Sequence, residues 1–187
     1  HFILQFPPVY GSSYFTLADM NADGRPDILY TNGDNADYSY SLKRYHGLRI
    51  FMNEGNDRFA EKFFYPVYGA SKVAAADFDS DGDLDLALIA FFPDEHQKPN
   101  EGFLFFENRG DLHFDVSTFK EAASGHWLVM DTGDVDGDGR PDIVLGSFFK
   151  SGLGQRTEKA ESTEQSLPTP HSYRPRTLRM APRGRTA

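Results

Sequence analysis

The sequence predicts an all-β fold: a partial, incomplete β-propeller of four-stranded antiparallel blades, about 2.5–3 in number, with a disordered C-terminal tail. Three observations support this fold class. A short acidic motif occurs three times at a nearly constant interval. The segments between its copies are short, rich in Phe, Val, Ile and Leu, and without a 3.6-residue apolar period. The last stretch of the chain has a different composition.

The repeat interval is defined by the motifs DMNADGRPDILY, DFDSDGDLDLAL and DVDGDGRPDIVL, which begin at Asp19, Asp77 and Asp134, 58 and 57 residues apart. Two other features keep the same register. PVYGSS recurs as PVYGAS 58 residues later, and LRIFMNEGNDRF recurs as GFLFFENRGDLHF. In LRIFMNEGNDRF and GFLFFENRGDLHF an apolar run is followed by Asn-x-Gly and then by Phe, which is typical of a turn between two strands. Three landmarks in phase indicate a repeat array.

Each repeat is expected to form four short strands. In the second repeat we place them at residues 72–76, 85–91, 102–107 and 113–119, with the acidic loop between the first two and a polar insertion between the middle two. We expect Trp127 and the Phe pairs 91–92, 105–106 and 148–149 to pack between blades rather than to serve as sugar platforms.

The chain divides by composition into residues 1–149, which carry the repeats, and residues 150–187. The second part has eight Lys or Arg and three Glu, is rich in Ser, Thr, Pro and Arg, and is almost without large aliphatic side chains. It cannot bury enough apolar surface to offset its conformational entropy, so we expect a disordered basic tail without a third strand for the last repeat.

Charge and composition exclude several classes of protein. The net charge is −9, and removing the tail's +5 leaves −14 for residues 1–149, which argues against nucleic-acid binding. No Cys is present, so disulfides and thiolate metal sites are excluded. The sequence contains no run of 18 apolar residues, so it predicts no membrane span. The start, HFILQF, is no signal peptide, and three repeats cannot close a ring, so we expect a fragment of a longer product.

The acidic loops are the candidate functional sites. Carboxylates about 4 Å apart repel by about 1 kcal/mol per pair in water, so three such loops call for a counter-charge. A hard divalent cation supplies it, and Ca²⁺ accepts six to eight oxygen ligands in irregular geometry. We expect up to three Ca²⁺ ions, held by positions 1, 3, 5, 7 and 9, with position 7 binding through its carbonyl: Asp19, Asn21, Asp23, Arg25 and Asp27; Asp77, Asp79, Asp81, Asp83 and Asp85; and Asp134, Asp136, Asp138, Arg140 and Asp142.

Other loop types fit less well. An EF-hand needs a bidentate Glu at position 12 between helices, whereas that position is Tyr30, Leu88 or Leu145, at the start of an expected strand. The loops hold no His or Cys, which argues against Zn²⁺, and the lack of Cys excludes thrombospondin-type repeats. Asn21 gives the first loop one charge fewer, and Asp83 adds one to the second, so we expect the first loop to bind most weakly.

The motifs DMNADGRPD, DFDSDGDLD and DVDGDGRPD resemble the calcium loops of the FG-GAP family, the integrin α-subunit type of propeller repeat, and are especially similar to its VCBS-type relatives. The resemblance covers about residues 1–149, although the literal Phe-Gly and Gly-Ala-Pro signatures are missing. It implies calcium ligands at the positions just named, in a mostly structural role.

Two readings of function remain open. Insertions 32–47 and 92–101 lie opposite the acidic loops, and Tyr38, Tyr40, Tyr45, Asp94 and His96 within them are candidate contacts for a protein or glycan. The first reading is a binding, adhesion or structural scaffold module, without catalysis. The alternative is a part of a secreted polysaccharide-active enzyme, although no nucleophile motif is present. Extracellular calcium modules bind at roughly 10⁻⁴–10⁻³ M, so we expect a secreted, periplasmic or cell-surface location.

Overall fold

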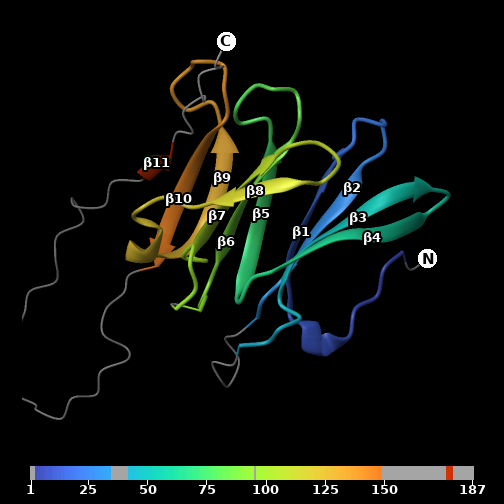
Figure 1. Cartoon of the computed structure of the whole chain (residues 1–187), viewed down its shortest axis with the longest axis horizontal. Helices are drawn as coiled ribbons and strands as arrows, with labels where there is room; N and C mark the ends of the chain where they lie inside the picture. Colours follow the sequence, from blue (N-terminus) through green and yellow to red (C-terminus); the bar gives the residue numbers. More distant parts are fainter. Residues whose placement is uncertain (1–2, 35–41, 95, 149–175, 179–187) are drawn as a thin grey trace, which may run out of the picture.

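The computed structural model describes residues 3–34, 42–94, 96–148 and 176–178, and these form three antiparallel β-sheets (Figure 1). Apart from two short 3₁₀ turns, η1 (Pro8–Tyr10) and η2 (Ala122–Ser124), every element in the described part of the chain is a strand. The all-β class and the four-stranded antiparallel blades predicted from the repeats are confirmed.

The first two sheets have four strands each, ordered β1-β2-β3-β4 and β5-β6-β7-β8, so each strand pairs with the next along the chain. All four strands of the second sheet agree with the predicted strands to within two residues at each end, the last one being shorter. The bounds are β1 (Ser12–Ala18), β2 (Asp27–Asn32), β3 (Gly47–Gly55), β4 (Arg58–Pro66), β5 (Ala70–Ala76), β6 (Asp85–Ala90), β7 (Phe103–Asn108) and β8 (Phe114–Ser117).

The third sheet contains β9 (His126–Gly133) and β10 (Asp142–Phe148), joined by the third acidic loop, and β11 (Arg176–Leu178). β11 pairs antiparallel with β10 from Ile143 to Leu145. These three residues are the exception to the predicted disordered tail, and they fill the third-strand position that we expected to be empty. Composition could not identify them, because the unpaired backbone groups along the edge of β10 can pair with almost any short extended segment. The remainder of 150–187 lies outside the described residues.

A buried cluster joins the first sheet to the second. Leu29 and Ile50 of the first sheet pack with Leu86 and Leu88 of the second, and all four side chains are fully buried. Burying one such side chain stabilises the fold by about 1.5–3 kcal/mol. This cluster therefore fixes the two sheets face to face.

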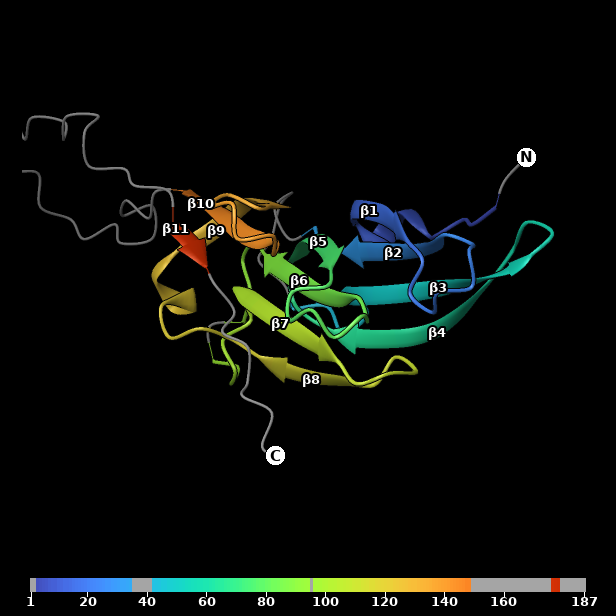
Figure 2. The ribbon, with the colours of Figure 1, turned by 90° about the horizontal axis from the view of Figure 1, so that it is seen from above.

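A second cluster joins the second sheet to the third, and it uses the opposite face of β6. Ala87 and Ile89 alternate with the residues of the first cluster and pack with Met130 and Ile143. β6 is thus buried on both faces, which explains its uninterrupted apolar sequence. β1 contacts β5, and β5 contacts β9, so the first strands lie side by side, with β4 and β8 at the outer edge (Figure 2).

Three of the aromatic residues assigned to the core, Trp127, Phe105 and Phe106, are found there. Trp127, Phe105 and Phe106 are at most 4% exposed, and the Trp127 indole donates to the Ala122 carbonyl at 2.9 Å. Phe91 and Phe92 are half-buried. Among the described residues, no helix is long and apolar enough to cross a membrane.

Candidate metal centres in three acidic loops

Each acidic loop joins the first strand of a sheet to the second: β1 to β2, β5 to β6, and β9 to β10. Strands on both sides of each loop exclude the EF-hand alternative. The β3–β4 and β7–β8 turns lie at the same end of their sheets, as the alternating strand direction predicts. The acidic loops are therefore the turns of a sheet end, held by the strands on either side.

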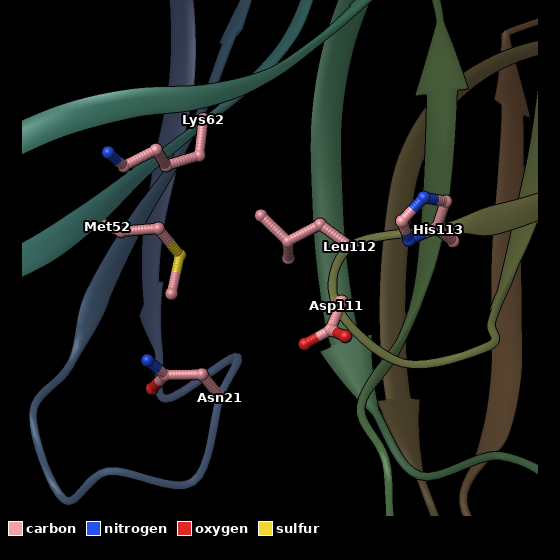
Figure 3. Close-up of a pocket in the computed structure, with 6 residues that line it drawn as sticks. All are labelled: Asn21, Met52, Lys62, Asp111, Leu112 and His113. Atoms are coloured by element: carbon pink, nitrogen blue, oxygen red, sulfur yellow. The ribbon is translucent and has the colours of Figure 1, made fainter.

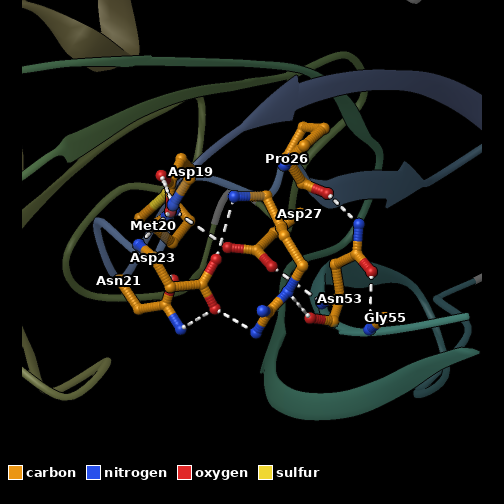
Figure 4. A network of polar contacts seen from close by, with 10 residues as sticks. Asp19, Met20, Asn21, Asp23, Pro26, Asp27, Asn53 and Gly55 are labelled. Atoms are coloured by element: carbon orange, nitrogen blue, oxygen red, sulfur yellow. Dashed lines mark hydrogen bonds and ion pairs between the residues drawn. The ribbon is translucent and has the colours of Figure 1, made fainter.

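The first loop wraps around the carboxylate at its first position (Figure 4). Asp19 accepts hydrogen bonds from the backbone N–H groups of Asp23 at 3.0 Å and Gly24 at 2.7 Å. The Asn21 side-chain oxygen accepts from the same Asp23 N–H at 3.3 Å, and Asp23 accepts from the N–H of Arg25 at 2.9 Å. The same bonds recur in the other loops, with Asp77, Asp79 and Asp81, and with Asp134, Asp136 and Asp138, as acceptors.

Position 6 of each loop adopts a conformation that only glycine takes without strain. The φ angles of Gly24, Gly82 and Gly139 are +83°, +100° and +85°. This left-handed turn directs the N–H group back to the carboxylate at position 1. All three loops make the same sharp turn at this position.

Position 9 is a buried carboxylate that links two turns of the same sheet. In the first sheet, Asp27 is fully buried; one of its oxygens accepts from the Met20 N–H at 2.9 Å and the other from the Asn53 N–H at 2.8 Å. In the second, Asp85 makes the same two bonds to Phe78 and Asn108. In the third, Asp142 accepts from the Val135 N–H at 3.1 Å. This residue therefore has a structural role that the sequence did not reveal.

The Asn-x-Gly turns complete the link. The Asn53 side chain donates to the Pro26 carbonyl at 3.0 Å and accepts from the Gly55 N–H at 2.9 Å. Asn108 makes the equivalent bonds to Leu84 and Gly110. The Asn-x-Gly motif recurs in phase with the acidic loops because the two turns touch. Sequence analysis found the shared period but not this contact.

Two of the loops bring three carboxylates together. Oxygens of Asp77, Asp79 and Asp85 lie within 4.8 Å of one another, and those of Asp134, Asp136 and Asp138 do the same. Among the described residues, the first loop shows no such group of three acids, since Asn21 replaces one of them. The predicted ligand positions thus converge most clearly in the second and third loops.

The second loop carries the greatest electrostatic strain. Burial raises the pKa of Asp85 from its ordinary 3.8 to about 6, and the nearby Asp79 and Asp81 carboxylates add to this shift. The pKa of Asp79 is also raised, first by burial and then by Asp81. Arg109 lies close by, but it pairs with other acids, Glu107 at 2.8 Å and Asp115 at 2.9 Å.

The first and third loops contain their own positive charge. Arg25 forms an ion pair with Asp23 at 2.6 Å, and Arg140 forms one with Asp138 at 2.9 Å. The Arg140 hydrogen bond holds the pKa of Asp138 below its ordinary value. In the second loop the corresponding residue is Asp83, so this position changes the loop charge from one repeat to the next.

The donor set of the loops fits calcium. Positions 1, 3, 5 and 9 offer carboxylate or amide oxygens, and position 7 adds a backbone carbonyl, which together match the all-oxygen preference of Ca²⁺. The backbone N–H groups bonded to these carboxylates fix the turn around them and leave further oxygen lone pairs for an ion.

A hollow of about 450 Å³ lies beside the first loop, between the first and second sheets (Figure 3). Asn21 faces it from the loop, and Met52 and Lys62 line it from β3 and β4. Asp111, Leu112 and His113 approach from the β7–β8 turn. The first loop is therefore open to solutes on the side of the second sheet.

The insertions lie at the other end of the sheets, and only part of the predicted contact set can be placed. Asp94 accepts from the backbone N–H of His96 at 3.0 Å, so this pair shapes its own loop. Tyr45 stacks on Tyr10 with ring centroids 5.2 Å apart. Tyr38 and Tyr40 lie outside the described residues.

Two titratable groups with shifted pKa values, one buried and one half-buried, occupy equivalent positions at this end, and neither was predicted from the sequence. His46 precedes β3 and is fully buried, and its ring nitrogens have no hydrogen-bond partner; burial lowers its pKa to about 4. Glu101 stands at the corresponding place before β7, where burial raises its pKa to about 7. Its carboxylate accepts from the Tyr68 N–H at 3.3 Å.

Comparison with known proteins identifies the repeat. The chain is similar to phosphatidylinositol-glycan-specific phospholipase D from Homo sapiens (26% identity) and from Bos taurus (28% identity). Each alignment covers 83% of this chain, which spans only 20% of the length of either relative. A family model for an FG-GAP-like repeat matches residues 31–88, from the end of β2 through the second acidic loop and into β6. This chain therefore contains an FG-GAP-like repeat.

Proposed function

We propose that this chain is a calcium-stabilised repeat segment in which each acidic loop holds one Ca²⁺ ion. The ligands are the side chains at positions 1, 3, 5 and 9 and the carbonyl at position 7, as assigned from the sequence. The ion neutralises the loop and tightens the turn between the first two strands of each sheet.

The observation that carries this proposal is the second loop. Asp77, Asp79 and Asp85 place oxygens within 4.8 Å of one another, and no Lys or Arg in the described part of the chain forms an ion pair with them. Mutual repulsion at this spacing opposes folding unless a cation is bound. A divalent ion with a flexible coordination shell removes that repulsion.

The test is the free energy of unfolding with calcium, with magnesium and with a chelator. At a Ca²⁺ concentration about tenfold above Kd, each occupied loop adds about 1.4 kcal/mol, and magnesium adds much less. Asp77→Asn is expected to lose the calcium-dependent stabilisation that the second loop contributes. Asp83→Asn removes the same charge but keeps the carbonyl, so it is the matched control and retains most of that stabilisation. An equal response to both metals, or none, would refute the proposal.

A second proposed role is a binding scaffold, adhesive or structural, outside the cytosol: secreted, periplasmic or at the cell surface. Its support is the rigid base of the insertion 32–47. Arg49 lies between the rings of Tyr10 and Phe64, 5.3 and 4.1 Å from their centroids. It donates to the Tyr45 carbonyl at 3.0 Å, and Asn32 donates to the same carbonyl at 2.9 Å. These bonds tie the two ends of the insertion together, as a presented loop requires.

Glycan-array and protein-capture experiments test this role. Replacing residues 92–101 by a short Gly-Ser linker, and separately exchanging Arg49→Leu, should each reduce binding of any protein or glycan ligand found. Binding that survives both changes would place the contact elsewhere.

We further propose that the segment itself is not catalytic. The two relatives are named as phospholipases, but this chain spans 20% of either of them. The position-9 carboxylates of the acidic loops accept hydrogen bonds from backbone N–H groups, which supports a structural role for them, and the sequence contains no nucleophile motif. Assays of the isolated chain with phospholipid and polysaccharide substrates, with and without calcium, should show no turnover. Hydrolysis that depends on a residue of this chain would favour the enzymatic alternative.

A further inference from the structure

We infer that Arg25 and Arg140 are built-in competitors of calcium, so that the loops fill in the order second, third, first. This inference rests on the proposed calcium sites and adds a means by which the chain sets their relative affinities. The residue at position 7 contributes a carbonyl to every loop, but its side chain differs: Arg in the first and third loops and Asp in the second.

In the first loop the arginine side chain is held on a candidate ligand. One guanidinium nitrogen of Arg25 lies 2.6 Å from Asp23, at position 5, and its Nε donates to the Asn53 carbonyl at 3.0 Å. The Asn21 amide donates to the same Asp23 oxygen at 3.0 Å. Two donors therefore occupy an oxygen that calcium would use, and the arginine has a second anchor on the neighbouring turn.

The third loop has the equivalent Arg–Asp ion pair, with fewer hydrogen bonds to it among the described residues. Arg140 contacts Asp138 at 2.9 Å, and position 3 is Asp136, which cannot donate as Asn21 does. The second loop has Asp83 at this place, with its side chain exposed. Competition is thus strongest in the first loop, weaker in the third and absent in the second.

The expected size of the effect follows from solvent exposure. The side chains are 50% and 24% exposed for Arg25 and Asp23, and 34% and 32% exposed for Arg140 and Asp138. Such pairs contribute up to about 1 kcal/mol and are screened by salt. When calcium displaces the guanidinium from the carboxylate, the repulsion between the two positive charges also decreases. Removing the guanidinium should tighten binding at that loop about three- to tenfold at low ionic strength, with a smaller gain at high salt.

The experiment is a calcium titration of the full chain followed by NMR. The amide signals of Gly24, Gly82 and Gly139 report on each loop separately, because each N–H bonds to the position-1 carboxylate of its own loop. Arg25→Met should tighten the first loop about three- to tenfold and leave the other two unchanged. The reciprocal change Asp83→Arg should weaken the second loop by a similar factor.

Arg58→Met is the matched control. Arg58 begins β4, is exposed and forms no ion pair with a described residue, so its loss changes the net charge equally without freeing a ligand. If Arg25→Met and Arg58→Met tighten the first loop equally, net charge explains the effect and the inference is overturned. It is also overturned if Arg25→Met changes nothing while all three loops bind. If no glycine signal responds to calcium in any variant, the calcium proposal itself fails.

Discussion

The first and second repeats share a hydrogen-bond scaffold and differ in charge at both ends of the sheet. At the acidic end, Asp27 and Asp85 make equivalent bonds to the two adjoining turns, although one loop contains an arginine and the other an additional aspartate. The backbone geometry of the loop is therefore set by a few acceptors. The residues around them can vary in charge without disturbing the fold.

The opposite ends differ in the same manner. His46 and Glu101 occupy one position of the repeat, and burial favours the neutral form of both. One group gains a positive charge as the pH falls, and the other gains a negative charge as the pH rises. The two repeats thus carry opposite pH responses on one architecture.

The largest effect is expected from removing the carboxylate at position 9. Asp27→Ala leaves two backbone N–H groups without their acceptor in a buried site and should cost about 2–4 kcal/mol. Asp85→Ala should cost about 1–2 kcal/mol less in a chelator, because it also relieves repulsion from Asp79 and Asp81. Urea denaturation measures both, with exposed Asp83→Ala as the control. Equal costs in the chelator would show that the second loop is not strained.

The next effect concerns acid stability of the first repeat. The folded-state pKa of His46 is about 4, below the ordinary 6.5, so its contribution is complete above pH 6.5 and is lost as the pH falls toward 4. Asp34 opposes this shift, while Lys43 and Arg49 reinforce it. Acidification should lower the free energy of unfolding by about 1–3 kcal/mol less in His46→Phe than in the unchanged chain. Urea denaturation at several pH values measures this difference. An unchanged pH profile would contradict the assignment.

A smaller and equal effect is expected at the two Asn-x-Gly turns. Asn53→Ala and Asn108→Ala each remove two side-chain hydrogen bonds to the backbone and should each cost about 1–2 kcal/mol. Because the bonds are the same in the two sheets, the costs should agree within about 0.5 kcal/mol at neutral pH. Thermal unfolding provides the comparison. A large difference would mean that the two repeats do not share one scaffold.

The smallest effect belongs to Glu101. Its folded-state pKa is raised from 4.5 to about 7, so its contribution is complete below pH 4.5 and declines as the pH rises toward 7. The side chain is partly exposed, so Glu101→Gln should flatten this decline by about 1 kcal/mol or less. The measurement is the same pH series used for His46. The two substitutions should change the pH dependence of the free energy of unfolding in opposite directions. A change in the same direction would contradict the comparison.

The sequence predicted the strand order, the blade architecture and the place of the acidic loops, because these depend on short-range patterns: the repeat interval, the apolar runs and the spacing of the acidic residues. It could not predict the bond from Asn108 to Asp85, since that contact joins turns 23 residues apart and uses a backbone N–H, which leaves no mark on side-chain chemistry. Burial of His46 was missed for a similar reason, because its surroundings combine groups from before and after the insertion, such as Asp34 and Arg49. β11 was missed because three residues carry no readable period.

The bonds between Asp85 and the β7–β8 turn tie together the acidic end of the second sheet. At the other end, the connection between β6 and β7 is anchored where Phe91 donates to the Gly69 carbonyl and where Glu101 accepts from the Tyr68 N–H, and lengthening the chain between these anchors carries a small entropic cost. A foreign peptide inserted there would project away from the acidic loops. The chain thus offers a carrier in which a displayed epitope and the acidic loops can be engineered separately.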